Sequence, residues 1–167
     1  MNVPVILIEM AAFAALFTVI VMTACRGDRK YTAAAIHNYP PDIQEEYFKT
    51  HERVPSEFFS KTVLIKKGCA LLVALLLMLA LAKWAGAYNF WSAFALSYGI
   101  WLFIDWYDCF FLDWVLFANM KAVRLPGTEH MDKAYHQKRY HFVQSLWGML
   151  IGLLPCLVGA AIYACIV

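Results

Sequence analysis

Three aspartates lie inside the apolar stretch IDWYDCFFLDW, residues 104–114. A lipid bilayer excludes an ionised carboxylate unless the carboxylate faces other helices, a wet cavity or a partner. At the 100° per residue of an α-helix, Asp108 falls about 60° to one side of Asp105, and Asp113 falls about 80° to the other side. The three carboxylates therefore form one broad stripe. We interpret Asp105 and Asp108 as functional, whereas Asp113 could equally be a solvated carboxylate at the end of the segment or part of a salt bridge between the helix and a loop.

A second group of ionisable residues follows in MKAVRLPGTEHMDKAYHQKRYHFVQS, residues 120–145. Pro126-Gly127 predicts a turn, and Thr128 can cap a new helix. If that helix runs on into the next apolar segment, four residues share one of its faces. These residues are Glu129, Asp132, His136 and Tyr140. The other interpretation is an ordinary interfacial helix whose basic residues bind anionic lipid headgroups.

Carboxylates and imidazoles together can do general acid–base chemistry or hold a divalent metal. Asp132 and His136 have the helical i, i+4 spacing of a metal-binding pair, but no established metal motif such as HExxH is present. The cofactor therefore stays unknown, with a divalent metal as one candidate. We predict a site that faces the cytoplasm. Its predicted catalytic residues are Asp105, Asp108, Asp113, Glu129 and His141, and its predicted ligand-binding residues are Trp101, Trp114, His136 and Tyr140.

Three functions fit this pattern. The first is a membrane-embedded enzyme or binding protein, whose aromatic residues line a pocket for a lipid-like or small amphiphilic ligand. The second is a proton- or cation-translocating subunit of an oligomer, in which Glu9 joins Asp105 and Asp108 in a relay. The third is a non-catalytic assembly or regulatory protein, whose acidic stripe pairs with a basic residue of a partner inside the membrane.

The composition indicates what positions these residues. The chain has 167 residues, of which 62% are hydrophobic. Four apolar segments are long enough to cross a bilayer as helices, at about 3–25, 63–86, 90–117 and 142–167. We therefore predict an all-α fold: a single transmembrane domain that forms a four-helix bundle. The third segment is longer than a bilayer needs, so we expect it to be tilted, kinked or partly outside.

Basic residues predict the orientation. Thirteen of the 14 Lys and Arg residues fall in or beside the connections 26–62 and 118–141, and Lys83 is the exception. Positive residues concentrate on the cytoplasmic side, so we expect both termini outside and amphipathic helices in both cytoplasmic loops. In the first loop, a helix should start at Pro40-Pro41. Its apolar face should consist of Ile43, Tyr47, Val54 and Phe58. A net charge of only +2 gives no indication of nucleic-acid binding.

The last apolar segment contains the spacing Gly148-x-x-x-Gly152. Small residues at this spacing let two helix backbones approach closely. We favour packing within the chain over a homo-oligomer through Gly148 and Gly152, and the lipid bilayer is the other expected partner.

The second half of the chain, from about Asp105 to Gly152, resembles a group of small, uncharacterised bacterial multi-pass membrane proteins. The resemblance rests on LDW (residues 112–114) followed by PGTE (126–129) and then YHF (140–142). It implies a bacterial cytoplasmic membrane location and implies that Asp113, Trp114, Glu129 and His141 belong to one unit with the Pro126-Gly127 turn. It implies no activity.

Overall fold

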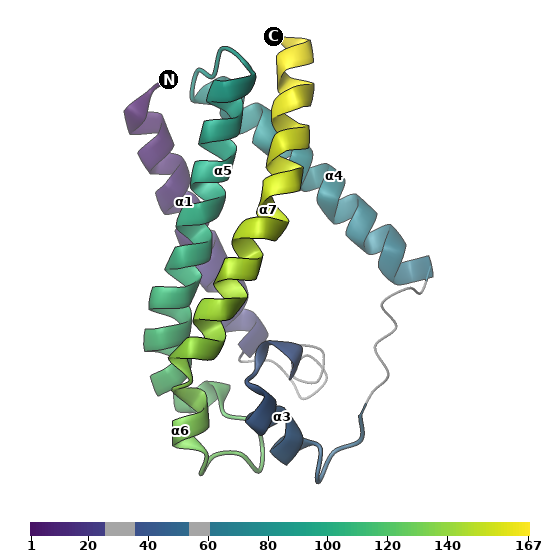
Figure 1. Ribbon diagram of the computed structural model, residues 1–167, viewed down its shortest axis with the longest axis vertical. Helices are drawn as coiled ribbons and strands as arrows, with labels where there is room; N and C mark the ends of the chain where they lie inside the picture. The colour runs from purple at the N-terminus through teal and green to yellow at the C-terminus, as the bar shows by residue number, and fades with distance from the viewer. Residues whose placement is uncertain (26–35, 54–60) are drawn as a thin grey trace. The chain divides into compact units, whose positions relative to one another are not determined.

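The computed structural model describes residues 1–25, 36–53 and 61–167, and this part of the chain is helical with no strand (Figure 1). The predicted all-α class is confirmed. The elements are α1 (Val3–Cys25), η1 (Ile36–Asn38), α3 (Pro41–Tyr47), α4 (Lys61–Trp84), α5 (Phe90–Tyr107), η2 (Asp108–Phe117), η3 (Lys121–Val123), α6 (Asp132–Tyr135) and α7 (Lys138–Ile166).

Three helical stretches are long and apolar enough to cross a bilayer, namely 3–23 in α1, 63–84 in α4 and 132–166 through α6 and α7. These stretches indicate a membrane protein. The predicted third span, 90–117, is not among them. Its α-helical part has only 18 residues, includes Asp105 and is rich in Trp and Tyr, and a helix of a different kind follows it.

The described residues divide into two compact units. Unit 1 contains 1–13, 61–104 and 147–167, and unit 2 contains 14–25, 36–53 and 105–146. Helices α1, α5 and α7 each contribute residues to both units. Each unit has its own hydrophobic core.

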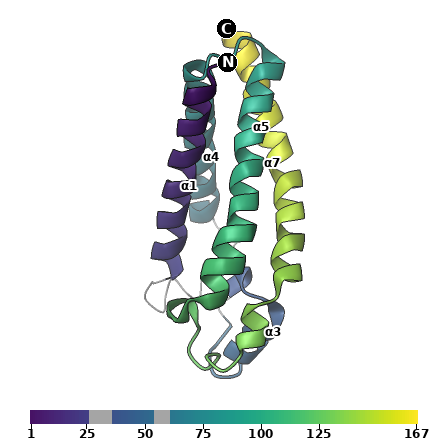
Figure 2. The same ribbon diagram turned by 90° about the vertical axis from the view of Figure 1, so that its left-hand side faces the viewer.

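The core of unit 1 is built largely from small residues near the turn between α4 and α5. Ala82, Ala85 and Ala93 are buried there together with Tyr163 of α7. The Asn2 N–H donates to the Ala85 carbonyl at 2.8 Å, and the Tyr163 hydroxyl donates to the Ala87 carbonyl at 2.7 Å. Both chain ends therefore lie at the same end of unit 1 as this turn (Figures 1 and 2).

Helix α4 joins that core only through its C-terminal part. Figure 1 shows α4 diverging from α1, α5 and α7 toward its N-terminal end. Leu64, Leu72 and Leu76 are more than half exposed. Apolar surface of this extent needs lipid or protein to cover it.

Gly148 and Gly152 form a seam on α7, and Trp101 of α5 covers this glycine seam within unit 1. The Trp101 indole Nε1–H donates to the Gly148 carbonyl at 3.0 Å. A methyl group added at Gly152 would overlap that same nitrogen, so only glycine leaves room for the indole. The expected packing of this seam within the chain is therefore observed between α5 and α7.

The core of unit 2 joins the first loop to the second. Helix α3 begins at Pro41, as predicted, and buries Ile43 and Tyr47 on the face expected for them. It ends at Tyr47, and residues 48–53 form a turn and irregular chain, so the predicted continuation of the helix past Tyr47 is wrong there. Val54 and Phe58 lie outside the described residues. On the exposed side of α3, the Lys49 ammonium donates to Glu46 at 2.6 Å and lowers the pKa of that carboxyl group.

The helix expected to run from Thr128 into the last span is broken, so that prediction is wrong. Helix α6 ends at Tyr135, and α7 starts only at Lys138. Thr128 does not cap a helix, because its hydroxyl donates back to the Leu125 carbonyl at 2.9 Å. The buried Tyr135 hydroxyl lies 2.7 Å from the Thr128 oxygen and accepts a hydrogen bond from the Leu125 N–H. In this group of hydrogen bonds the Thr128 and Tyr135 hydroxyls are both satisfied, and the bonds hold the chain before α7 in a bend.

Candidate functional site

The segment η2, which carries two of the three aspartates, is a π-helix of 10 residues. In an α-helix, residues five apart lie about 140° apart around the axis. In a π-helix, the hydrogen bonds run from i to i+5, so residues five apart stack on one side. Asp108 and Asp113 have this spacing. The broad stripe expected from α-helical angles is therefore narrowed, and the two carboxylates are brought onto one side.

Asp113 lies within hydrogen-bonding distance of His141 of α7. The distance from its Oδ2 to His141 Nδ1 is 2.9 Å, and the two side chains are 23% and 6% exposed. The imidazole ring also makes edge contacts with Phe117 and Tyr140, at centroid distances of 5.4 and 5.3 Å. These contacts fix the orientation of the ring. His141 Nε2 is buried and has no hydrogen-bond partner within the described part of the chain.

Asp108 and Asp105 complete an acidic group around this pair. The Asp108 carboxylate interacts electrostatically with Asp113, Asp105 and His141. The Oδ2 atom of Asp105 is buried, and no described residue supplies it with a hydrogen bond. We call Asp105, Asp108, Asp113 and His141 the Asp–His cluster. It brings together four of the five predicted catalytic residues, all of them in unit 2.

One turn from the contact between Asp113 and His141, Cys109 and Ser145 make a second contact between η2 and α7. Both residues are buried and their side chains are hydrogen-bonded. Cys109 precedes Asp113 by four residues, and Ser145 follows His141 by four. Two successive polar contacts therefore fix the register of η2 against α7.

Aromatic rings line the same part of unit 2. Trp106 stacks on Phe110 at 5.1 Å and contacts Phe142 of α7 at 5.5 Å. Phe110 in turn meets Trp114 edge-on at 4.9 Å. The Lys138 ammonium lies 5.0 Å from the centre of the Trp114 ring, and the Trp114 Nε1–H has no partner among the described residues. Three of these rings, Trp106, Trp114 and Phe142, directly follow a member of the Asp–His cluster in the sequence.

The other predicted site residues lie at different places. Tyr140, next to His141, interacts electrostatically with Asp113. Trp101 belongs to unit 1, on the glycine seam of α7. Glu129 and His136 are exposed in the second loop, where His136 Nδ1 lies 2.8 Å from the Asp132 carbonyl. The Asp132 carboxylate pairs with Arg124 at 2.8 Å, so Asp132 and His136 do not act as a pair.

Glu9, proposed above for a relay, lies in unit 1. It is 1% exposed on the face of α1 that packs into the core beside Met10 and Phe13. Neither carboxylate oxygen has a hydrogen-bond partner in the described residues.

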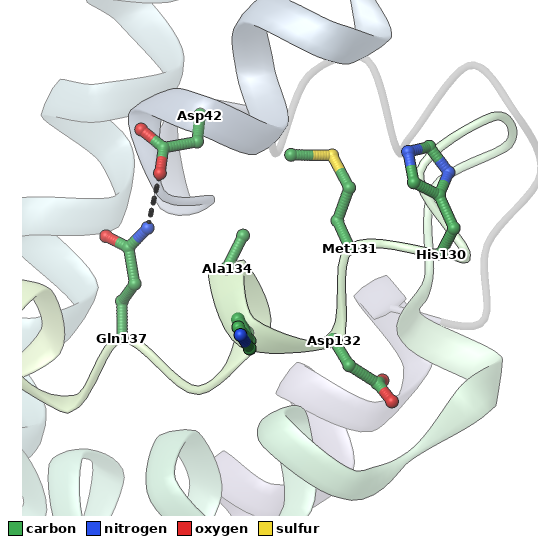
Figure 3. Close-up of a pocket in the computed structure, with 7 residues that line it drawn as sticks. Asp42, His130, Met131, Asp132, Ala134 and Gln137 are labelled. Carbon is green, nitrogen blue, oxygen red and sulfur yellow. Dashed lines mark hydrogen bonds between the residues drawn. The ribbon is translucent and has the colours of Figure 1, made fainter.

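An open hollow of about 470 Å³ lies elsewhere in unit 2, between α3 and the second loop (Figure 3). It is lined by Asp42, His130, Met131, Asp132, Lys133, Ala134 and Gln137. The Gln137 amide donates to Asp42 at 2.7 Å, and the side chains of His130 and Asp132 point apart (Figure 3). Across residues 1–25, 36–53 and 61–167, no group of three or more His, Cys, Asp or Glu is arranged to hold a metal ion.

Two residues that matter here were not singled out from the sequence. Ser145 could have been found, because it lies one helical turn after His141 and so shares its face. Arg124 gives no such signal. Its side chain is 7% exposed, donates to the Ala118 carbonyl at 2.9 Å and stacks over the Tyr135 ring at 3.8 Å. Arg124 thereby ties the end of η2 to α6.

Comparisons with protein-family models, with curated proteins and with solved structures found no match to this chain.

Proposed function

We propose that this chain is a multi-pass membrane protein and that its Asp–His cluster is an acid–base site for a small amphiphilic ligand. One observation carries the proposal: Asp113 holds the Nδ1 side of His141, while Nε2 is buried without a partner. A carboxylate that fixes one imidazole nitrogen leaves the other free to exchange a proton with a bound molecule. A purely structural histidine would be expected to have both nitrogens satisfied.

The π-helix supports the same proposal. Ten residues of π-helix are unusual, since such geometry occurs mostly as single turns, often at functional sites. Here the unusual geometry stacks two carboxylates that would repel each other. A segment selected only for stability would gain by avoiding that repulsion.

The membrane arrangement is part of the proposal. In it, α1, α4, α5 with η2, and α7 are four spans, and the chain is a four-helix membrane bundle with both termini outside. Support comes from the three long apolar helices and from the shared position of both chain ends at one end of unit 1. The concentration of Lys and Arg in the two loops supports a cytoplasmic location for the loops. The Asp–His cluster then lies toward the cytoplasmic side.

The experiment is photolabelling of the protein in lipid nanodiscs with a neutral decyl diazirine, followed by peptide mapping. We expect saturable labelling in residues 105–114 and 140–146, around Trp106, Phe110 and Phe142. His141→Gln should reduce this labelling, and the matched control His136→Gln, an exposed imidazole in the second loop, should not. Labelling that is spread over all lipid-exposed helices and unchanged by His141→Gln would overturn the proposal.

A further inference from the structure

We infer that the ligand of the Asp–His cluster is an apolar molecule with a protonated amine as its head group. This inference rests on the function proposed above and names the ligand class. A group of acidic residues alone would not identify a ligand. The second observation is His141, a polar side chain about 95% buried, whose Nε2 has no partner in the described part of the chain.

The carboxylates of the Asp–His cluster favour a ligand with a positive charge. The cluster consists of three aspartates and one histidine, and Asp113 contacts the histidine. Arg124, which could have supplied a permanent positive charge, pairs with Asp132 in the second loop. Asp108 interacts with both of the other carboxylates. A bound positive charge would relieve this repulsion.

Hydrogen bonding selects a cation that carries N–H groups. With Nδ1–H donating to Asp113, a neutral His141 ring presents a lone pair at Nε2. The unpartnered Oδ2 of Asp105 is also an acceptor. Both buried atoms therefore require donors from the ligand. A protonated amine supplies up to three N–H donors, whereas a quaternary ammonium supplies none.

The spacing of the acceptors favours an amine over a metal ion. No group of three donors in the described residues is arranged to hold a metal. Metal ligands must converge to about 2.0–2.6 Å from the ion. An ammonium group binds through longer hydrogen bonds, of about 2.7–2.9 Å from nitrogen to oxygen. It therefore tolerates acceptors that are further apart.

Aromatic rings would accept the rest of the ligand. Trp106, Phe110 and Phe142 form a continuous apolar group beside the acidic residues. Aromatic faces attract cations and also pack against alkyl chains. A lipophilic amine matches both properties, with its head at the carboxylates and its tail along the rings.

The experiment is competition against the neutral decyl diazirine, using four competitors with the same alkyl chain. They are decylamine, decyltrimethylammonium, decanol and decanoate. We expect decylamine to displace the label from residues 105–114 at a concentration at least about tenfold below that of decanol, given the strength of charged hydrogen bonds. Decyltrimethylammonium should be weaker than decylamine, and decanoate should be the weakest. Asp108→Asn should remove most of the advantage of decylamine, whereas Glu45→Gln, an exposed control in α3, should not.

The outcomes separate this inference from the proposed function. If decanol or decanoate competes as well as decylamine, the inference of an amine head group is wrong. A site that binds a displaceable amphiphile would still remain. Equal competition by decyltrimethylammonium would also overturn the inference, because N–H donors would then be irrelevant. If the label is neither saturable nor displaced by any competitor, the proposed function itself fails. Circular dichroism of each variant in nanodiscs confirms folding, and Asp105→Asn serves as the second variant if Asp108→Asn does not fold.

Discussion

Asp113 Oδ2 lies 2.9 Å from His141 Nδ1, and this contact joins the π-helical segment η2 to the start of α7. Its effect depends on backbone geometry as well as on the two side chains. Because η2 has π-helical hydrogen bonds, Asp108 stacks on the same side as Asp113. One contact therefore fixes the helix register and assembles an acidic site beside a buried imidazole.

Removing one partner of this pair should destabilise the protein. Asp113→Ala leaves the His141 Nδ1–H buried without an acceptor, at a cost of about 1–3 kcal/mol. We give the lower part of the range more weight, since Asp113 is 23% exposed. Asp113→Asn keeps an acceptor oxygen and should cost less. Thermal unfolding in nanodiscs measures the difference. Equal losses from Asp113→Ala and Asp113→Asn would show that the hydrogen bond contributes nothing.

The alignment of the two aspartates in η2 can be tested by lengthening the segment. Inserting one alanine after Phe111, an exposed residue between Asp108 and Asp113, makes the aspartates six residues apart, a spacing that places them about 120° apart around an α-helix. We expect helix content to be retained by circular dichroism while saturable photolabelling is lost. The matched control is Phe111→Ala, which changes a side chain at the same point without changing the spacing and should keep the labelling. Labelling that survives the insertion would contradict the role of η2.

The close contact between Trp101 and Gly152 predicts opposite effects at two glycines. Gly152→Ala places a methyl group closer to the Trp101 ring than van der Waals contact allows and should destabilise unit 1 by about 1–3 kcal/mol. Gly68→Ala in α4 meets nothing within 4 Å and should be neutral or stabilising, by up to about 1 kcal/mol, through helix propensity. Unfolding measurements on both variants test the pair. Adding Trp101→Ala to Gly152→Ala should recover part of the loss, and no recovery would mean that the clash lies elsewhere.

The buried carboxyl group of Glu9 should destabilise the native protein. Both of its oxygens are buried without a partner in the described residues, and the surrounding core is apolar. A buried carboxyl group without a hydrogen-bond partner costs free energy that a hydrophobic residue of similar size does not. We therefore expect Glu9→Leu to raise the unfolding temperature, and Glu9→Gln to raise it less. A lower unfolding temperature in Glu9→Leu would reveal a stabilising partner for the carboxylate.

The sequence was sufficient to predict the long apolar helices. Apolar runs predicted α1, α4 and α7, because a bilayer leaves a long apolar segment little alternative to a helix. Pro41 predicted the start of α3, since proline fits the first turn. The contact between Asp113 and His141 joins two residues that we predicted to share a site.

Other features depend on contacts that no local pattern shows. The bend before α7 is imposed by Tyr135, whose hydroxyl reaches back to Leu125 and Thr128. The π-helical hydrogen bonds of η2 have no counterpart in the residue pattern of 108–117, which predicts ordinary α-helical spacing. Helical periodicity assumed for the whole second loop therefore placed Glu129 and His136 with the site, whereas both are exposed in the loop.

Nitrogen-15 NMR of the histidine side chains in nanodiscs tests the central claim most directly, with His141 assigned by its loss in His141→Gln. The account predicts a proton on Nδ1 and a lone pair on Nε2 of His141. It also predicts that decylamine shifts the Nε2 resonance while decanoate leaves it in place. A proton on Nε2 of the neutral ring, or an Nε2 resonance that decylamine does not move, would contradict an acid–base site that accepts an amine at His141.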